Sequence, residues 1–195
     1  GLIWSLSYEL FDDYCWGDWK QRDAEGAPAL TGWVPPSTLL SPANAVAMGY
    51  LQLVARAFVG IALAAGLAVK FQVGEPWWWV NPGGKLCAYD SATTAALGGA
   101  GVAIPDVAGA LDAGQCAMLD ALGGLLATST AALVAAARDE AGGGGLVNHL
   151  LVFLPTALDP AAPDLRRANV PLGWAAPAFD VLQLEDYDWV TGGRG

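Results

Sequence analysis

Acidic residues follow three segments that have the side-chain pattern of β-strands. Glu9 closes the segment 2–10, and Glu75 follows the alternating apolar residues of 69–73. The third acidic group follows the segment 179–184 and consists of Glu185, Asp186, Tyr187 and Asp188. In a barrel of parallel strands these ends meet at one rim. Two carboxyl groups facing one bond can act as general acid and as nucleophile or base, as glycoside hydrolysis requires.

Three consecutive tryptophans, Trp77, Trp78 and Trp79, come directly after Glu75 and a proline. Tryptophan offers a flat apolar surface with one polar group, which suits stacking on a sugar ring. Apolar surface beside Glu75 would also raise its pKa by desolvation, as a general acid needs. The alternative is an ordinary solvated loop glutamate, and the sequence leaves both interpretations open.

The other candidates also have plain structural interpretations. Glu9 could be the polar end of a strand, and Asp186 and Asp188 could cap the following turn. Glu185 and Tyr187 are therefore the better candidates for a pocket. Further tryptophans lie in the irregular segment 11–40, and they could equally pack in the core or stack on a sugar: Trp16, Trp19 and Trp33.

The predicted elements alternate along the chain. We expect strands at 2–10, 69–73, 146–154 and 179–184, helices at 42–66 and 112–142, a long loop at 11–40 and a hairpin insertion at 80–90. Such alternation predicts an α/β fold with a parallel sheet, either a (β/α)8 barrel or a doubly wound sheet. A complete barrel typically has about 250 residues. With 195 residues, we expect a single partial-barrel domain from a longer polypeptide.

Composition argues against several functional classes. The net charge is −10 and the nine basic residues are scattered, so no nucleic-acid surface is expected. The uncharged stretch 57–69 is too short to span a membrane. The stretch 121–137 is interrupted by glycine, serine and threonine, so we expect buried helices at both places. Three cysteines and one histidine without ligand spacing predict no metal. No glycine-rich phosphate loop is present, so no cofactor is expected, and no secretory leader is visible.

Two segments resemble known families. The run 71–76, Phe-Gln-Val-Gly-Glu-Pro, resembles the fourth-strand Asn-Glu-Pro motif of retaining barrel glycosidases, although Gly74 stands where that family has asparagine. The segment 179–189 resembles the sixth-strand region of those barrels. Five pieces are similar to the glycosidase-like TIM barrels in tail, or baseplate, proteins of phages and gene transfer agents: 4–11, 19–22, 32–42, 71–79 and 168–191.

The resemblance implies a register and a function. The predicted strands become strands three to six of a partial (β/α)8 barrel, with Glu75 as acid/base and the family's nucleophile beyond Gly195. Glu185 becomes a second catalytic candidate. Substrate contacts are expected from Glu9, Trp77, Trp78, Trp79, Asp186, Tyr187 and Asp188. The implied role is a barrel acting on or binding a cell-surface or cell-wall glycan in a virion tail, beside other tail proteins. The alternative is an inactive structural or glycan-binding tail module.

Overall fold

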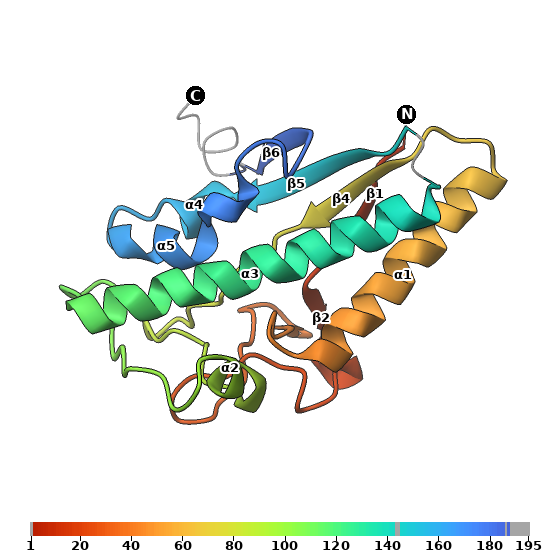
Figure 1. The fold of residues 1–195 in the computed structure, drawn as a ribbon. Helices are drawn as coiled ribbons and strands as arrows, with labels where there is room; N and C mark the ends of the chain where they lie inside the picture. The colour runs from red at the N-terminus through yellow and green to blue at the C-terminus, as the bar shows by residue number, and fades with distance from the viewer. Residues whose placement is uncertain (1, 143–144, 186, 188–195) are drawn as a thin grey trace.

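The computed structural model describes residues 2–142, 145–185 and 187 (Figure 1). The strands are β1 (Trp4–Ser7), β2 (Glu9–Phe11), β3 (Ser37–Leu39), β4 (Lys70–Gly74), β5 (Val147–Phe153) and β6 (Val181–Glu185). The helices are α1 (Ala45–Ala64), α2 (Ser91–Ala96), α3 (Ala113–Glu140), α4 (Leu154–Ala157) and α5 (Arg166–Asn169). Short 3₁₀ turns are η1 (Asp12–Tyr14), η2 (Pro163–Leu165) and η3 (Leu172–Trp174).

The main sheet contains four parallel strands in the order β1-β4-β5-β6. The long helices α1 and α3 cross one face of this sheet (Figure 1). The predicted α/β alternation is therefore confirmed, and strands β1, β4, β5 and β6 correspond to the four predicted strands. Because all four run in the same direction, their carboxyl ends lie along one edge of the sheet.

The two faces of the sheet differ in chemistry. Phe71 and Val73 of β4 point toward the helices and are completely buried. Leu150 of β5 lies on the same face and is 2 % exposed. The intervening positions on the opposite face carry Gln72 and His149. Parallel strands are usually apolar on both faces. On this inner face Gln72 and His149 are polar groups among apolar neighbours such as Leu151.

Helix α3 begins as its sequence predicts. Asp112 is the N-cap, and its side chain accepts from the Gln115 N–H at 2.8 Å. The Gln115 Oε1 in turn accepts from the Asp112 N–H at 2.9 Å. Helix α1 begins later than the predicted Ser41-Pro42 start. Its N-cap is Asn44, whose Oδ1 accepts from the N–H groups of Val46 and Ala47 at 3.0 Å each.

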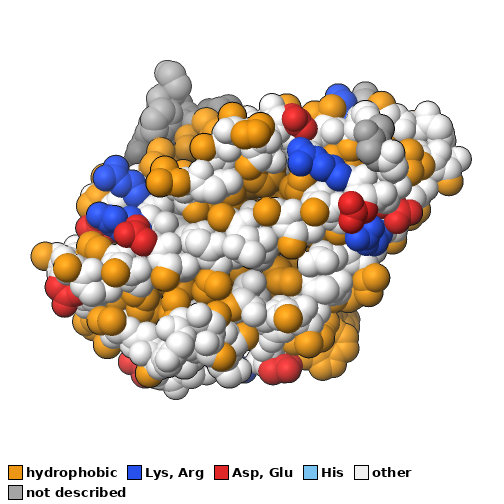
Figure 2. Space-filling model, viewed as in Figure 1, with side chains coloured by type: hydrophobic (Ala, Val, Ile, Leu, Met, Phe, Trp, Pro, Cys, Tyr) orange, Lys and Arg blue, Asp and Glu red, His pale blue; other side chains and the backbone are white. Residues whose placement is uncertain are grey.

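Both long helices are rich in small and apolar residues. The middle of the helix-covered face carries few charged side chains (Figure 2). By length and composition both helices could cross a membrane, but 33 % of the most apolar window of α1 and 50 % of that of α3 are buried within the fold. Gly123 of α3 shows why small residues are needed, since a Cβ there would lie 2.3 Å from the Arg167 carbonyl oxygen of α5.

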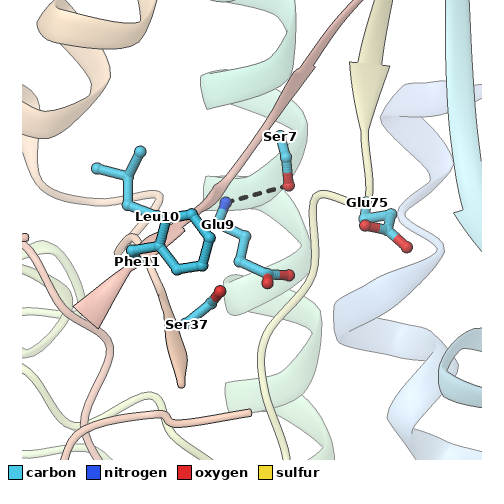
Figure 3. Close-up of a pocket in the computed structure, with 6 residues that line it drawn as sticks. All are labelled: Ser7, Glu9, Leu10, Phe11, Ser37 and Glu75. Carbon is cyan, nitrogen blue, oxygen red and sulfur yellow. Dashed lines mark hydrogen bonds between the residues drawn. The ribbon is translucent and has the colours of Figure 1, made fainter. Parts of the chain in front are cut away.

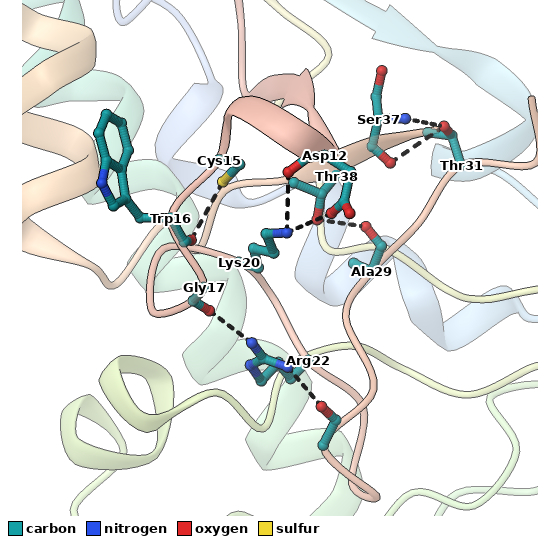
Figure 4. Close-up of polar contacts among 11 residues, drawn as sticks. Asp12, Cys15, Trp16, Gly17, Lys20, Arg22, Ala29, Thr31, Ser37 and Thr38 are labelled. Carbon is teal, nitrogen blue, oxygen red and sulfur yellow. Dashed lines mark hydrogen bonds and ion pairs between the residues drawn. The ribbon is translucent and has the colours of Figure 1, made fainter. Parts of the chain in front are cut away.

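The predicted first strand and the loop 11–40 are organised differently from the prediction. The segment 2–10 is not one strand, because β1 ends at Ser7 and Glu9 already belongs to β2. Strand β2 pairs antiparallel with β3. Strand β3 lies inside the segment 11–40, which was predicted to be an irregular loop. Polar contacts hold this segment together (Figure 4), including the Lys20–Asp12 ion pair at 2.6 Å. Arg22 also donates to the Gly17 and Gly26 carbonyl oxygens.

Two buried amides hold the backbone of the tryptophan segment. The Asn169 side chain accepts from the Trp78 N–H at 2.8 Å and donates to the Trp78 carbonyl oxygen at 3.2 Å. Gln21 donates to the Trp77 carbonyl oxygen at 2.9 Å and accepts from the Trp79 N–H at 2.8 Å. The segment lies outside the sheet, so these amides replace the hydrogen bonds that a neighbouring strand would supply.

Removing the Asn169 amide should destabilise the fold. Asn169→Ala leaves the buried N–H and carbonyl of Trp78 without partners, so the free energy of unfolding should fall by about 1–3 kcal/mol. Asn169→Asp keeps the acceptor for the Trp78 N–H and loses the donor to the Trp78 carbonyl oxygen. Its change in the free energy of unfolding should therefore differ from that of Asn169→Ala. Urea unfolding of the two variants and wild type measures this. A free energy of unfolding for Asn169→Ala equal to wild type would contradict the account.

Candidate functional site

Glu75 lies immediately beyond the carboxyl end of β4 in an unusual conformation. Its φ is 49°, in the left-handed region that non-glycine residues rarely adopt. Its N–H donates to the Leu151 carbonyl oxygen at 3.1 Å, so the residue remains anchored to β5. A left-handed conformation costs about 1–2 kcal/mol. Such strain is concentrated at functional sites, and here it turns the Glu75 side chain out of the strand pattern.

Glu185 is brought to Glu75 by the register of the sheet. It is the last residue of β6 and pairs with Phe153 at the end of β5. The two carboxyl groups lie within hydrogen-bonding range of each other. A hydrogen bond between carboxyl groups requires that one of them carry a proton. Glu185 is hydrogen-bonded both to Glu75 and to the Tyr187 hydroxyl.

The environment keeps Glu75 protonated. Burial raises the pKa of Glu75 to about 8, with further contributions from the hydrogen bond to Glu185, the charge of Glu185 and the charge of Glu9. Desolvation and nearby negative charge both disfavour the ionised form of a carboxyl group. The raised pKa makes the Glu75 carboxyl group a candidate proton donor.

An open cavity of about 360 Å³ lies between β2 and Glu75 (Figure 3). Its lining residues are Ser7, Glu9, Leu10, Phe11, Ser37 and Glu75. The Ser7 hydroxyl accepts from the Glu9 N–H at 3.1 Å and so fixes the turn that presents Glu9. Leu10 and Phe11 provide an apolar wall, and Phe11 is 54 % exposed. The cavity thus combines two carboxyl groups, two hydroxyl groups and an aromatic surface.

The structure brings together those predicted acidic residues that it describes. Glu9, Glu75 and Glu185 form one electrostatic group. Tyr187 is 63 % exposed, and a hydrogen bond to Glu185 raises the pKa of its hydroxyl. Tyr187 therefore belongs to the same group. Asp186 and Asp188 lie outside the described residues, so their predicted roles stay predictions.

The tryptophans do not form the predicted stacking surface. Trp78 is completely buried, and its indole N–H donates to the Leu122 carbonyl oxygen of α3 at 3.0 Å. Trp77 is 7 % exposed and packs on Phe153, with ring centroids 6.1 Å apart. Only Trp79 is half-buried. For Trp78 the expectation was wrong because the chain turns at Glu75 and runs inward under the helices.

Gly74 stands at the position where the glycosidase motif has asparagine, and the neighbouring strand explains the difference. A Cβ at Gly74 would lie 3.0 Å from the Ser5 hydroxyl and 3.5 Å from the Leu6 carbonyl oxygen, both of β1. A larger side chain would force Ser5 to move. The glycine therefore reflects close contact between β1 and β4 on the inner face, and no amide is present there to contact a sugar.

Several residues around the site were not identified from the sequence. Leu10, Phe11, Ser7 and Ser37 line the cavity because β2 turns away from β1 and pairs with β3. The only sequence signal was their proximity to Glu9. Among the described residues, no group of three potential metal ligands is found, and Cys15, Cys87 and Cys116 are free thiols.

Comparison with known proteins identifies the family. Residues 1–195 match the family described as "Non-contractile tail sheath protein TIM barrel". The chain belongs to this family. It is thus a TIM-barrel module of a phage tail, as the resemblance implied. A comparison with curated protein sequences finds no match.

The tail sheath barrel also has a solved structural neighbour. It is similar to the catalytic domain of beta-amylase from Paenibacillus polymyxa, with a TM-score of 0.57 and 15 % sequence identity. The similarity covers 87 % of this chain and 53 % of the beta-amylase chain. At this identity the likeness shows the fold alone. The tail sheath barrel therefore spans about half the length of that domain, in agreement with a partial barrel.

The raised pKa of Glu75 predicts a specific dependence of stability on pH. The folded state binds the proton more tightly than the unfolded chain, so Glu75 favours folding at low pH and this contribution is lost as pH rises from about 4.5 to about 8. One proton gives a slope of up to about 1.4 kcal/mol per pH unit, reduced by solvent screening at a half-buried group.

Denaturant unfolding between pH 5 and pH 9 measures this effect. Wild type should lose stability relative to Glu75→Gln across the interval, because the variant cannot ionise at this position. Glu140→Gln, at the exposed end of α3, is the matched control and should follow wild type. Parallel curves for wild type and Glu75→Gln would show that Glu75 has an ordinary pKa.

Proposed function

We propose that this tail sheath barrel binds a cell-surface or cell-wall glycan in the cavity beside Glu9 and Glu75, with Glu75 as general acid. The observation that carries the proposal is the position of Glu75, a half-buried carboxyl group beside Glu185, at the edge of an open cavity. A general acid needs a pKa near the working pH, and burial raises the pKa of Glu75 to about 8. Membership of the tail sheath family further implies assembly with other tail proteins.

The three carboxyl groups would have different roles. Glu75 would donate its proton to the glycosidic oxygen. Glu185 raises the pKa of Glu75 through a hydrogen bond and through its charge. Its role would be to hold the proton on Glu75. Glu9, on the cavity wall formed by β2, is the better candidate for a second carboxylate that faces the substrate.

The aromatic surface for a sugar would come from Phe11 instead of the tryptophans. Phe11 is half-exposed and lines the same cavity as Glu9 and Glu75. An apolar ring face stacks on the C–H groups of a sugar, while carboxylate and hydroxyl oxygens accept hydrogen bonds from its hydroxyl groups. Ser7 and Ser37 add two such hydroxyl groups to the cavity.

The second candidate function is a glycan-binding or structural tail module without hydrolysis. Two observations favour it. Gly74 replaces the asparagine of the glycosidase motif, and Ser5 fills the space that such a side chain would need. Trp78 is also buried in the core and cannot contact a ligand. These features remove contacts that would stabilise a transition state, and they leave the binding cavity intact.

Hydrolysis and binding can be measured separately on the full-length protein, with purified envelope glycan of the host as probe. We expect Glu75→Gln to reduce release of reducing sugar by about 10²–10⁴-fold while glycan binding changes only a few-fold. Phe11→Ala should weaken binding. Glu140→Gln is the control for loss of one carboxylate.

The possible results separate the two candidates. Binding that depends on Phe11 without sugar release by wild type would support the module without hydrolysis. Release of sugar that is unchanged in Glu75→Gln would remove Glu75 from the mechanism. Absence of both binding and release in wild type would contradict the proposed function.

A further inference from the structure

One wall of the cavity comes from a single face of the β2–β3 ribbon. Phe11 and Ser37 are directly opposite each other in this antiparallel pair, and Glu9 is opposite Leu39. Opposite residues of a pair, and alternate residues of one strand, lie on the same face. Glu9, Phe11 and Ser37 therefore share a face, and all three line the cavity (Figure 3). The wall thus presents a carboxylate, an aromatic ring and a hydroxyl group together.

Ser37 is fixed through its backbone, and its hydroxyl group remains available. Its N–H donates to the Thr31 Oγ1 at 2.9 Å, and its carbonyl oxygen accepts from the Thr31 N–H at 2.9 Å (Figure 4). The residue is only 5 % exposed. Its hydroxyl group points away from Thr31 and toward Glu9 (Figure 3). Among the described residues no group bonds to the Ser37 Oγ, so this hydroxyl can bond to a ligand in the cavity.

Negative charge in the cavity is not balanced by a basic side chain. The Glu9 carboxylate has no ion pair among the described residues, and none of the described lysines or arginines lines the cavity. Lys20, beside the end of β2, is already paired with Asp12 at 2.6 Å. Burial raises the pKa of Glu75, and the hydrogen bond to Glu185 and the charges of Glu185 and Glu9 raise it further. The field of these carboxyl groups therefore reaches across the cavity.

We propose that this cavity takes sugars without anionic groups, and that Glu9 and Ser37 recognise two free hydroxyl groups of one sugar ring. This inference rests on the proposed function and adds the class of glycan to it. Glu9 and Ser37 are diagonal neighbours, which lie about 7–8 Å apart in an antiparallel pair. A ring stacked on Phe11 can donate one hydroxyl hydrogen to Glu9 and bond to Ser37 through another hydroxyl group.

Phosphate and carboxylate groups cannot make the same contacts. When ionised they have only acceptor oxygens, so they offer no hydrogen to the Glu9 carboxylate. They also bring like charge into a cavity without a base. A bridging cation would remove this conflict, but residues 2–142, 145–185 and 187 contain no group of three histidine, cysteine, aspartate or glutamate side chains that could hold a metal ion. The net charge of −10 extends the repulsion to an approaching polyanion.

Binding of charge-separated fractions of one glycan tests this proposal. Purified envelope glycan of the host is divided by anion exchange into an uncharged fraction and a retained, anionic fraction. Calorimetric titration of the full-length protein should give an apparent Kd at least about 10-fold lower for the uncharged fraction, because like charge opposes entry of the anionic one. Raising the salt concentration from about 0.01 M to about 1 M shortens the Debye length from about 30 Å to about 3 Å, so the difference should shrink.

Two variants locate the selection. Glu9→Gln keeps the size of the side chain and one acceptor oxygen but removes the charge, so it should reduce the preference for the uncharged fraction to a few-fold. Ser37→Ala should weaken binding of the uncharged fraction by about 2- to 10-fold. Glu140→Gln at the exposed end of α3 and Ser91→Ala at the exposed start of α2 are the matched controls and should behave as wild type.

The possible results separate this inference from the proposed function. An anionic fraction that binds wild type as tightly as the uncharged fraction in about 0.01 M salt would overturn the inference and leave glycan binding in place. A preference that does not change with salt would show that charge does not cause it, and would also overturn the inference. Both measurements use wild type alone, so they decide the question even if a variant fails to fold. Binding of neither fraction would contradict the proposed function itself.

Discussion

The parallel register of β4, β5 and β6 is the constraint on which the rest of this molecule depends. It aligns Gly74 with Leu151 and Phe153 with Glu185, so the residues that follow β4 meet the last residue of β6. Burial and the neighbouring Glu185 then raise the pKa of Glu75. The acidity of Glu75 is a consequence of strand pairing, and any shift of register would separate the pair.

The turn after β4 connects this chemistry to the core. Glu75 adopts a left-handed conformation, after which the chain enters the protein and places Trp78 under α3. Asn169 and Gln21 then satisfy the backbone of the buried segment. Trp78 therefore lies in the core and not on the cavity wall.

Much of the fold follows from the sequence, and the parts that do not follow have physical reasons. The helix predicted at 112–142 and the strand predicted at 146–154 rest on local signals, and the structure contains both. The approach of Glu75 to Glu185 was predictable because parallel strand ends meet at one edge. Glu9 comes from β2, which was not predicted as a separate strand. Helix α1 is apolar on both faces: Leu51 is buried while Leu53 is 68 % exposed. Its buried face therefore could not be identified from spacing alone.

The break between β1 and β2 and the burial of Trp78 depend on partners distant in sequence. Tyr8 separates the two strands and contacts Ser129 of α3 at 2.9 Å, a pairing across 121 positions. Asn169 holds Trp78 across 91 positions. No local pattern in the sequence encodes such contacts. The same is true of the cavity wall at Leu10 and Phe11, which exists only because β3 pairs with β2.

The central claim is that Glu75 carries a proton at neutral pH because it is desolvated beside Glu185. Carbon-13 NMR titration of the glutamate carboxyl groups in the full-length protein tests this directly, with the Glu75 signal assigned by its loss in Glu75→Gln. We predict an apparent pKa of about 8 for Glu75 in wild type. In Glu185→Gln the pKa should be lower but should stay above the ordinary value, because burial remains. A wild-type Glu75 signal that titrates near 4.5, unchanged by Glu185→Gln, would contradict the account.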